Sequence, residues 1–69
     1  MKIFVSNTCN NCTVVKNMNN NRTIPIDTIN ITEEADYIEK YNLTTVPSLL
    51  KGEKIITNIQ KITEIVKGE

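Results

Sequence analysis

The sequence predicts an α/β fold in which a four-stranded mixed sheet is flanked by three helices, in the order β-α-β-α-β-β-α. Three observations lead to this prediction. Short apolar or alternating runs, typical of strands, alternate with segments whose apolar residues recur at helical spacing. Strands that alternate with helices form a parallel pair joined by a right-handed crossover. Two apolar runs near the end of the chain flank a tight turn at 51–53 and predict an antiparallel hairpin.

The first half of the chain is predicted to form a strand, a helix and a second strand. The continuous apolar run 3–5 suits a strand that is buried on both faces. A helix is predicted from Cys9, and its apolar face carries Cys12, Val15 and Met18, with Val14 nearby. The asparagines at 19–21 end this helix, because Asn side chains compete for backbone hydrogen bonds. The alternating run 24–29 is predicted as an edge strand, since Pro25 has no N–H to donate.

The second half of the chain is predicted to form a helix, a hairpin and a last helix. Thr32 is a good N-cap, and the acidic residues of the following turn favour a helix start: Glu33, Glu34 and Asp36. The apolar face of this helix is predicted to carry Ala35, Ile38 and Tyr41 or Leu43. Strands are predicted at 46–50 and 54–57. Asn58 can cap the last helix, whose apolar stripe is Ile59, Ile62, Ile65 and Val66.

Length and composition limit the classes of protein that the chain can represent. Its 69 residues suffice for one domain, which we expect to span 1–69. Eight basic and eight acidic residues cancel, there is no basic run, and there is no Trp, so nucleic-acid binding is not expected. No apolar stretch is long enough to span a membrane or to act as a signal peptide. We therefore expect a cytoplasmic monomer.

Cys9 and Cys12 form a Cys-x-x-Cys pair at the start of the first predicted helix. Residues three apart in a helix share a face, with Cα atoms about 5–6 Å apart, which suits an unstrained disulfide. The free N–H groups of a helix start stabilise an anion, so the pKa of the Cys9 thiol should lie below its usual range. The thiolate is the attacking species in disulfide exchange, and the pattern therefore predicts redox chemistry.

Position along the helix predicts a role for each cysteine. Cys9, at the helix tip, is expected to attack a substrate disulfide, and Cys12, one turn inside, to resolve the mixed disulfide. A structural disulfide is disfavoured in a reducing cytoplasm. Zinc requires four ligands, and the sequence has no His and no second Cys pair, so a zinc site would have to be intermolecular. Cu(I), which thiolates favour, stays open as an alternative to redox chemistry.

The chain resembles the glutaredoxin branch of the thioredoxin-like family over nearly its whole length. The resemblance rests on Cys9-Asn10-Asn11-Cys12 after the first strand, on Thr45-Val46-Pro47 at the third strand, and on the element order. It implies a glutaredoxin-type, thioredoxin-like fold and a small electron carrier that reduces protein disulfides. It also implies a cis Val46–Pro47 bond beside the cysteines. Thr45, Val46 and Pro47 would then bind substrate, with the backbone of Val46 pairing with a peptide or with glutathione.

The loop around the cysteines departs from the family pattern. Thr8 stands where a thioredoxin has Trp, and Asn10 and Asn11 replace the usual residues between the cysteines. No Lys or Arg lies just before the cysteines, and Thr57-Asn58 replaces the glutaredoxin Gly-Gly pair. The resemblance implies no bound cofactor other than the redox-active Cys9–Cys12 disulfide. It implies electrons from a thioredoxin-reductase-type flavoenzyme or from glutathione. Because residues with which glutaredoxins bind glutathione are missing here, the flavoenzyme fits at least as well as glutathione.

Two other classes of function use the same features. A Cu(I)-binding metallochaperone has a similar length and a Cys-x-x-Cys at its first helix, but its elements run β-α-β-β-α-β. Here a helix is predicted after the second strand and at the end of the chain, and Asn7 stands where that family usually has Met. A redox-inactive interaction module on the same fold would have unreactive thiols. We therefore expect a thiol–disulfide oxidoreductase, with Cu(I) carriage as the alternative.

Overall fold

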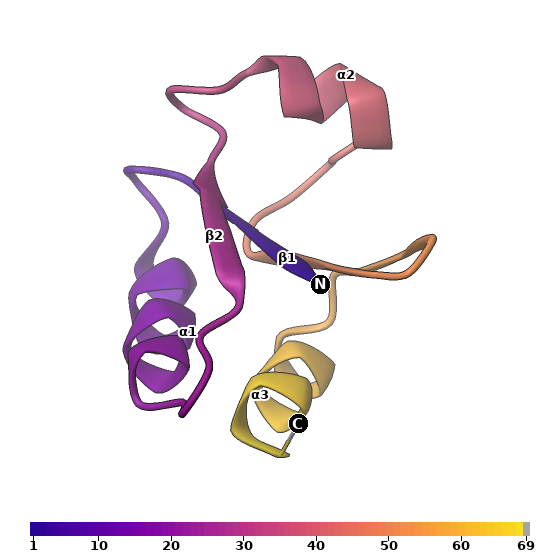
Figure 1. Ribbon diagram of the computed structural model, residues 1–69. Helices are drawn as coiled ribbons and strands as arrows, with labels where there is room; N and C mark the ends of the chain where they lie inside the picture. The colour runs from indigo at the N-terminus through magenta and orange to yellow at the C-terminus, as the bar shows by residue number, and fades with distance from the viewer. Residues whose placement is uncertain (69) are drawn as a thin grey trace.

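Seven elements follow one another in the predicted order β-α-β-α-β-β-α within residues 1–68, which the computed structural model describes. They are β1 (Lys2–Val5), α1 (Asn10–Asn20), β2 (Asp27–Asn30), α2 (Asp36–Tyr41), β3 (Ser48–Lys51), β4 (Lys54–Ile56) and α3 (Ile59–Gly68). The four strands form one mixed sheet in the order β2-β1-β3-β4 (Figure 1). The predicted α/β fold, with its helices flanking a mixed sheet, is confirmed.

The register of the strands brings four loops to one end of the sheet. β1 pairs in parallel with β2, so that Val5 lies opposite Asn30 at the C-terminal ends of both strands. β3 runs antiparallel to β1 and begins at Ser48, opposite Phe4. β4 is antiparallel to β3, and Ile56 ends it at the same side. The loop after β1, which carries Cys9, therefore lies next to the loop before β3, which carries Val46 and Pro47.

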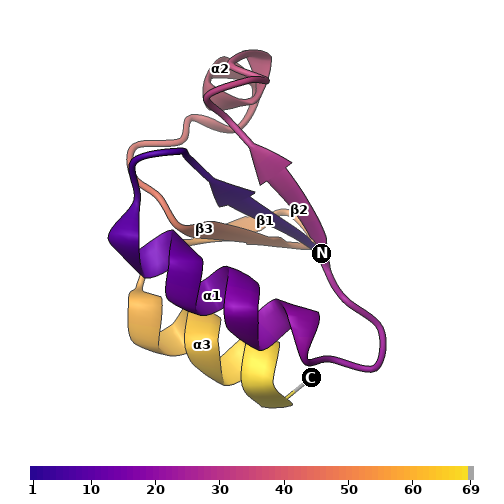
Figure 2. The same ribbon diagram turned by 90° about the vertical axis from the view of Figure 1, so that its left-hand side faces the viewer.

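The sheet separates two apolar clusters. α1 and α3 lie side by side on one face, and α2 covers the other (Figure 2). The first cluster, here the helix-pair cluster, consists of Ile3, Val5, Cys12, Val15, Ile26, Leu49, Ile62 and Val66. The second, here the aromatic cluster, consists of Phe4, Ile29 and Leu43, with Tyr37 and Tyr41 packed against it. Successive side chains of β1 enter opposite clusters, so β1 is buried on both faces, as predicted.

Strand boundaries differ from the sequence predictions near both prolines. β2 covers Asp27–Asn30 rather than 24–29, and Pro25 precedes it. β2 is nevertheless an edge strand, as predicted. β3 begins at Ser48, one residue after Pro47, rather than at 46. In both places the proline itself lies outside the hydrogen-bonded ladder, as expected where an N–H is missing.

The second helix begins at Asp36, and the prediction that Thr32 caps it is wrong. Ala35 is the N-cap residue, and its side chain makes no capping hydrogen bond. The Thr32 hydroxyl instead accepts a hydrogen bond of 3.2 Å from the backbone N–H of Asn7, in the loop after β1. The predicted apolar face is also only partly right: Leu43 is buried, but Ile38 is 38% exposed. The aromatic side chains, Tyr37 and Tyr41, make the contacts of α2 with the sheet.

The first and last helices form as predicted. α1 begins after Cys9 and buries Cys12 and Val15, although Val14 is exposed. At the start of α3, Asn58 Oδ1 accepts hydrogen bonds from the backbone N–H groups of Gln60 (2.9 Å) and Lys61 (3.4 Å). Ile62 and Val66 are buried, and the other two residues of the predicted stripe pack at its border. Throughout residues 1–68, no helix has the combined length and apolar content that a bilayer crossing requires.

Candidate redox site

A disulfide joins Cys9 and Cys12 across the first turn of α1. Their Cα atoms lie 5.2 Å apart, within the range expected for residues three apart in a helix. Cys9 is the N-cap residue and has an extended backbone, with φ −105° and ψ 113°, whereas Cys12 is already helical. The sequence prediction that these two cysteines form one pair at a helix start is therefore borne out by the geometry.

The sulfur of Cys9 occupies the place of an N-cap acceptor. Cys9 Sγ accepts a hydrogen bond of 3.1 Å from the backbone N–H of Cys12. A helix start carries unpaired N–H groups and the positive end of the helix dipole, and both stabilise negative charge on the capping atom. The first turn of α1 contains no acidic residue that would oppose this effect. The same N–H is therefore positioned to stabilise a Cys9 thiolate after the disulfide is reduced.

The two sulfurs differ in their access to solvent. Cys12 is 1% exposed and belongs to the helix-pair cluster, whereas Cys9 is half-buried and packs at the border of that cluster. Thr8, Asn10 and Asn11, predicted as the active-site loop, are all exposed around Cys9. An external disulfide would therefore reach Cys9 before Cys12. This difference supports the predicted roles of attacking and resolving cysteine, which remain predictions.

The Val46–Pro47 peptide bond is cis, as the family resemblance implied. Because β3 pairs with β1, this bond lies in the loop neighbouring the one that carries Cys9. Val46 is half-buried and packs against the same apolar cluster as Cys9, Pro47 is buried, and Thr45 is exposed. The structure thus brings the two predicted motifs together at one end of the sheet. Substrate binding by 45–47 stays a prediction.

Ser48, the first residue of β3, contacts this loop and was not predicted as part of the site. It is fully buried, and its hydroxyl donates a hydrogen bond to the carbonyl oxygen of Thr45. Among the described residues, no backbone hydrogen bond outside the regular elements uses the N–H or carbonyl of Val46. Ser48 therefore stabilises the turn from one side while the backbone of Val46 stays available. A Ser directly after Pro in an otherwise apolar strand was the available signal.

A second set of polar residues ties the loop after β1 to the end of β2. Asn30 Nδ2 donates to Asn7 Oδ1 (2.6 Å), the Asn7 N–H donates to Thr32 Oγ1 (3.2 Å), and the Thr32 N–H donates to Asn30 Oδ1 (2.9 Å). We call these three residues the Asn7–Asn30–Thr32 network. Asn7 is two residues before Cys9, so the network limits the movement of the chain that leads into the disulfide. Sequence alone could not pair residues this far apart.

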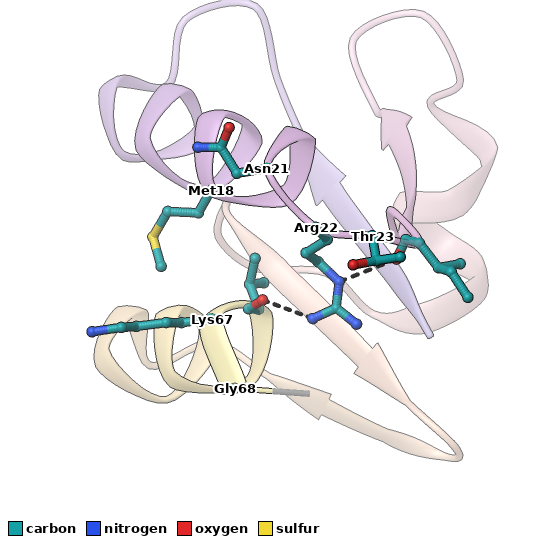
Figure 3. A pocket seen from close by; sticks show the side chains of 8 residues that line it. Met18, Asn21, Arg22, Thr23, Lys67 and Gly68 are labelled. Atoms are coloured by element: carbon teal, nitrogen blue, oxygen red, sulfur yellow. Dashed lines mark hydrogen bonds between the residues drawn. The ribbon is translucent and has the colours of Figure 1, made fainter.

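The pocket shown in Figure 3 lies at the opposite end of α1 from the disulfide. Arg22 is its central charged group, and it donates to the carbonyl oxygens of Val66 (2.7 Å), Ile65 (3.3 Å) and Ile24 (3.2 Å). The guanidinium thus satisfies the carbonyls of the last turn of α3, where the helix dipole favours a cation. These contacts give Arg22 a structural role, and the pocket is not part of the redox site.

Within residues 1–68, the structure shows no ready set of ligands for a hard or tetrahedral metal ion. Among the described residues, His, Cys, Asp and Glu do not gather in any group of three or more. The two thiols of Cys9 and Cys12 are the soft ligands that this end of the sheet provides. The structure therefore adds no support for the intermolecular zinc site that the sequence left open.

Comparison with known proteins identifies the fold. No family model matches the sequence, and no curated protein matches it. The chain is similar to a crystal structure of a mutant of the thioredoxin-like protein BC3987, with a TM-score of 0.71. The match covers 94% of this chain and 96% of that chain at 13% sequence identity. At this identity the likeness concerns the fold, which is thioredoxin-like, and a Cys-x-x-Cys pair at the first helix of such a fold is consistent with a redox role.

Proposed function

We propose that this protein is a thiol–disulfide oxidoreductase that reduces protein disulfides by dithiol exchange. The proposal rests chiefly on the unequal environments of the two sulfurs. Cys9 Sγ is accessible and accepts the Cys12 N–H at the start of α1, whereas Cys12 is buried behind it. A pair that differs in this way can act in sequence. The thiolate at the surface attacks the substrate first, and the buried thiol reacts only with the mixed disulfide that results.

The exchange proceeds in two balanced steps. The Cys9 thiolate of the reduced protein attacks one sulfur of a substrate disulfide, which forms a mixed disulfide and releases one substrate thiolate. Deprotonated Cys12 then attacks Cys9 Sγ, which forms the Cys9–Cys12 bond and releases the second substrate thiolate. Each released thiolate takes up a proton from water. Two electrons pass from the protein to the substrate, and the product has the disulfide found in the structure.

The remaining predicted site residues would contact the substrate, and a separate reductant would restore the dithiol. We expect an extended segment of the substrate to pair with the backbone of Val46, between Thr45 and Pro47. Thr8, Asn10 and Asn11 would form the rim around Cys9. The electrons would come from a thioredoxin-reductase-type flavoenzyme or from glutathione. In this proposal the protein serves electron transport and redox homeostasis in the cytoplasm.

Reduction of insulin tests the proposed function directly. We expect turnover with dithiothreitol as the electron source. Parallel reactions with glutathione and its reductase, and with a thioredoxin-reductase-type flavoenzyme, would distinguish the two donors. Cys9→Ser should abolish turnover, because the attacking sulfur is lost. Full activity in this variant would contradict the role of Cys9.

Cys12→Ser should stop the reaction at the mixed disulfide. Cys9 can still attack, but no second thiolate is present to release the bound partner. The trapped species would be measured by mass spectrometry of the intact protein after incubation with oxidised insulin. Cys9→Ser is the matched control and should trap none. If only Cys9→Ser traps the partner, the two roles are reversed.

The element order supports one of the arguments against the Cu(I) alternative. A metallochaperone of that type was expected to have the order β-α-β-β-α-β, whereas this chain has β-α-β-α-β-β-α. The two thiols still offer the soft ligands that Cu(I) prefers. Absence of turnover with every donor, together with tight Cu(I) binding, would favour this alternative over disulfide exchange.

A further inference from the structure

We infer that the redox end of the protein selects a partner disulfide flanked by uncharged residues. The inference rests on the proposed function and concerns which disulfides the protein reduces fastest. We call the surface the neutral end. It consists of the three loops that meet beside the disulfide, 6–9, 42–47 and 57–58, together with the first turn of α1.

Apart from the two cysteines, these segments contain no ionisable side chain. Lys, Arg, Asp and Glu are absent from 3–15, from 42–50 and from 55–60. The exposed side chains of the neutral end are instead almost all Asn and Thr. The three loops adjoin in space, because the register places the end of β1, the start of β3 and the end of β4 at the same side of the sheet. A partner that docks over Cys9 and Val46 therefore meets hydroxyls, amides and backbone around the Cys9 sulfur.

Charges on the strands are concentrated at the other end of the sheet. Lys2 lies opposite Asp27 in the parallel pair, and Lys51 lies opposite Lys54 in the hairpin. The molecule extends 29 × 25 × 20 Å, whereas the Debye length at physiological ionic strength is about 8 Å. The far charges are therefore screened from a partner at the disulfide. The whole chain also has no net charge with which to steer an approaching partner.

The fourth loop at the redox end carries two acidic residues. Glu33 and Glu34 follow the edge strand β2, on the side of β1 away from β3. The uncharged Asn7–Asn30–Thr32 network joins this loop to the loop of Cys9. The surface between Cys9 and Val46 lies on the other side, between β1 and β3. We therefore expect these carboxylates to have no effect on which disulfide is taken.

Desolvation makes the neutral end favour an uncharged partner over a charged one. A charged residue of the partner that is pressed against Asn and Thr loses water and finds no opposite charge, which costs free energy for either sign. An uncharged polar residue loses less and can form neutral hydrogen bonds with the same side chains. A disulfide flanked by uncharged residues is thus the chemistry that fits this surface.

Three peptide disulfides of equal length test the inference, with Lys, Glu or Gln on both sides of each Cys. The second-order rate with the reduced protein is divided by the rate at which dithiothreitol reduces the same peptide, which corrects for the leaving thiol. We expect the Gln peptide to react about three- to tenfold faster than the other two, which corresponds to about 0.7–1.4 kcal/mol. Dithiothreitol also attacks as a thiolate, so the division removes the attraction of Lys and the repulsion of Glu at the attacking sulfur. The corrected rates of the Lys and Glu peptides should therefore agree within about twofold, and added salt should not change the corrected rates.

Two variants locate the effect on the surface. Glu33→Gln combined with Glu34→Gln should leave all three rates unchanged. Thr44→Lys places a cation on an exposed position of the neutral end. It should make the Glu peptide faster than the Lys peptide, and salt should remove that difference.

Other outcomes contradict the inference in distinct ways. Equal rates for the three peptides would show that the surface has no preference for an uncharged partner. A Lys or Glu peptide that is fastest, with a rate that falls as salt is added, would show charge steering. Failure to react with any of the peptides, when dithiothreitol reduces all of them, would overturn the proposed function itself.

Discussion

Asn19 links the end of α1 to the chain that enters β2. It is 3% exposed, and its side-chain amide makes two hydrogen bonds of 2.8 Å to Ile26. Nδ2 donates to the Ile26 carbonyl oxygen, and Oδ1 accepts from the Ile26 N–H. The asparagines at 19–21 end the helix, as predicted. Asn19 also takes the place of a strand partner for the backbone of Ile26, which sequence alone could not indicate.

Asn19→Ala should lower the free energy of unfolding by about 2–4 kcal/mol, because it leaves the buried N–H of Ile26 without a partner and leaves the Ile26 carbonyl oxygen only the longer hydrogen bond from Thr28 Oγ1 (3.4 Å). Urea denaturation of the oxidised protein would measure the change. Asn20→Ala is the matched control: it lies in the same turn but is exposed, and its effect should stay within about 0.5 kcal/mol. Equal effects of the two substitutions would show that the contacts of Asn19 with Ile26 contribute nothing.

Sequence reasoning succeeded for the elements whose signals are local. The cap at Asn58 and the apolar stripes of α1 and α3 all follow from residues within a few positions of one another. The Cys pair and the cis Val46–Pro47 bond of the candidate site were likewise predicted from short motifs. The Asn7–Asn30–Thr32 network depends on strand register and was not predicted. That network is also the reason why α2 was misplaced, since it uses the hydroxyl expected to cap that helix.

α2 should be the least protected helix of the protein. It has six residues, buries none of them fully and has no side-chain cap at its N-terminus. Its contacts with the sheet are aromatic. The centroid of the Phe4 ring lies 5.7 Å from that of the Tyr37 ring and 5.5 Å from that of the Tyr41 ring. We expect its amide hydrogens to exchange with solvent at least about tenfold faster than the central amides of α1 and α3, because local opening exposes little buried surface. Equal protection in all three helices would contradict this expectation.

On the scale of the whole molecule, the candidate redox site lies at one end of the sheet and a stabilising contact between distant segments lies at the other. The disulfide, the cis proline and the neutral end lie at one end. At the other, Arg22 joins the loop between α1 and β2 to the last turn of α3, across 44 positions of the sequence. The same chain can therefore be stabilised at one end without altering the redox site at the other.

Arg22→Ala should lower the free energy of unfolding by about 1–3 kcal/mol, because hydrogen bonds from a cation to the carbonyls of α3 are lost. Thermal or urea denaturation would measure the loss. Lys67→Ala, an exposed residue in that last turn, is the control and should change stability by less than about 1 kcal/mol. Insulin reduction by the folded Arg22→Ala protein should match that of the original chain. A selective loss of turnover would show that the two ends are coupled.

The separation of the two apolar clusters by the sheet determines which optical signals the protein gives. The chain has one Phe, two Tyr and no Trp, and all three rings pack in the aromatic cluster on the α2 face. Cys12 belongs to the cluster on the opposite face. Intrinsic tyrosine fluorescence will therefore report the docking of α2 and stay silent when the disulfide is reduced. A reporter for the thiol chemistry has to be introduced on the other side of the sheet, for instance as a Trp in place of the exposed Val14.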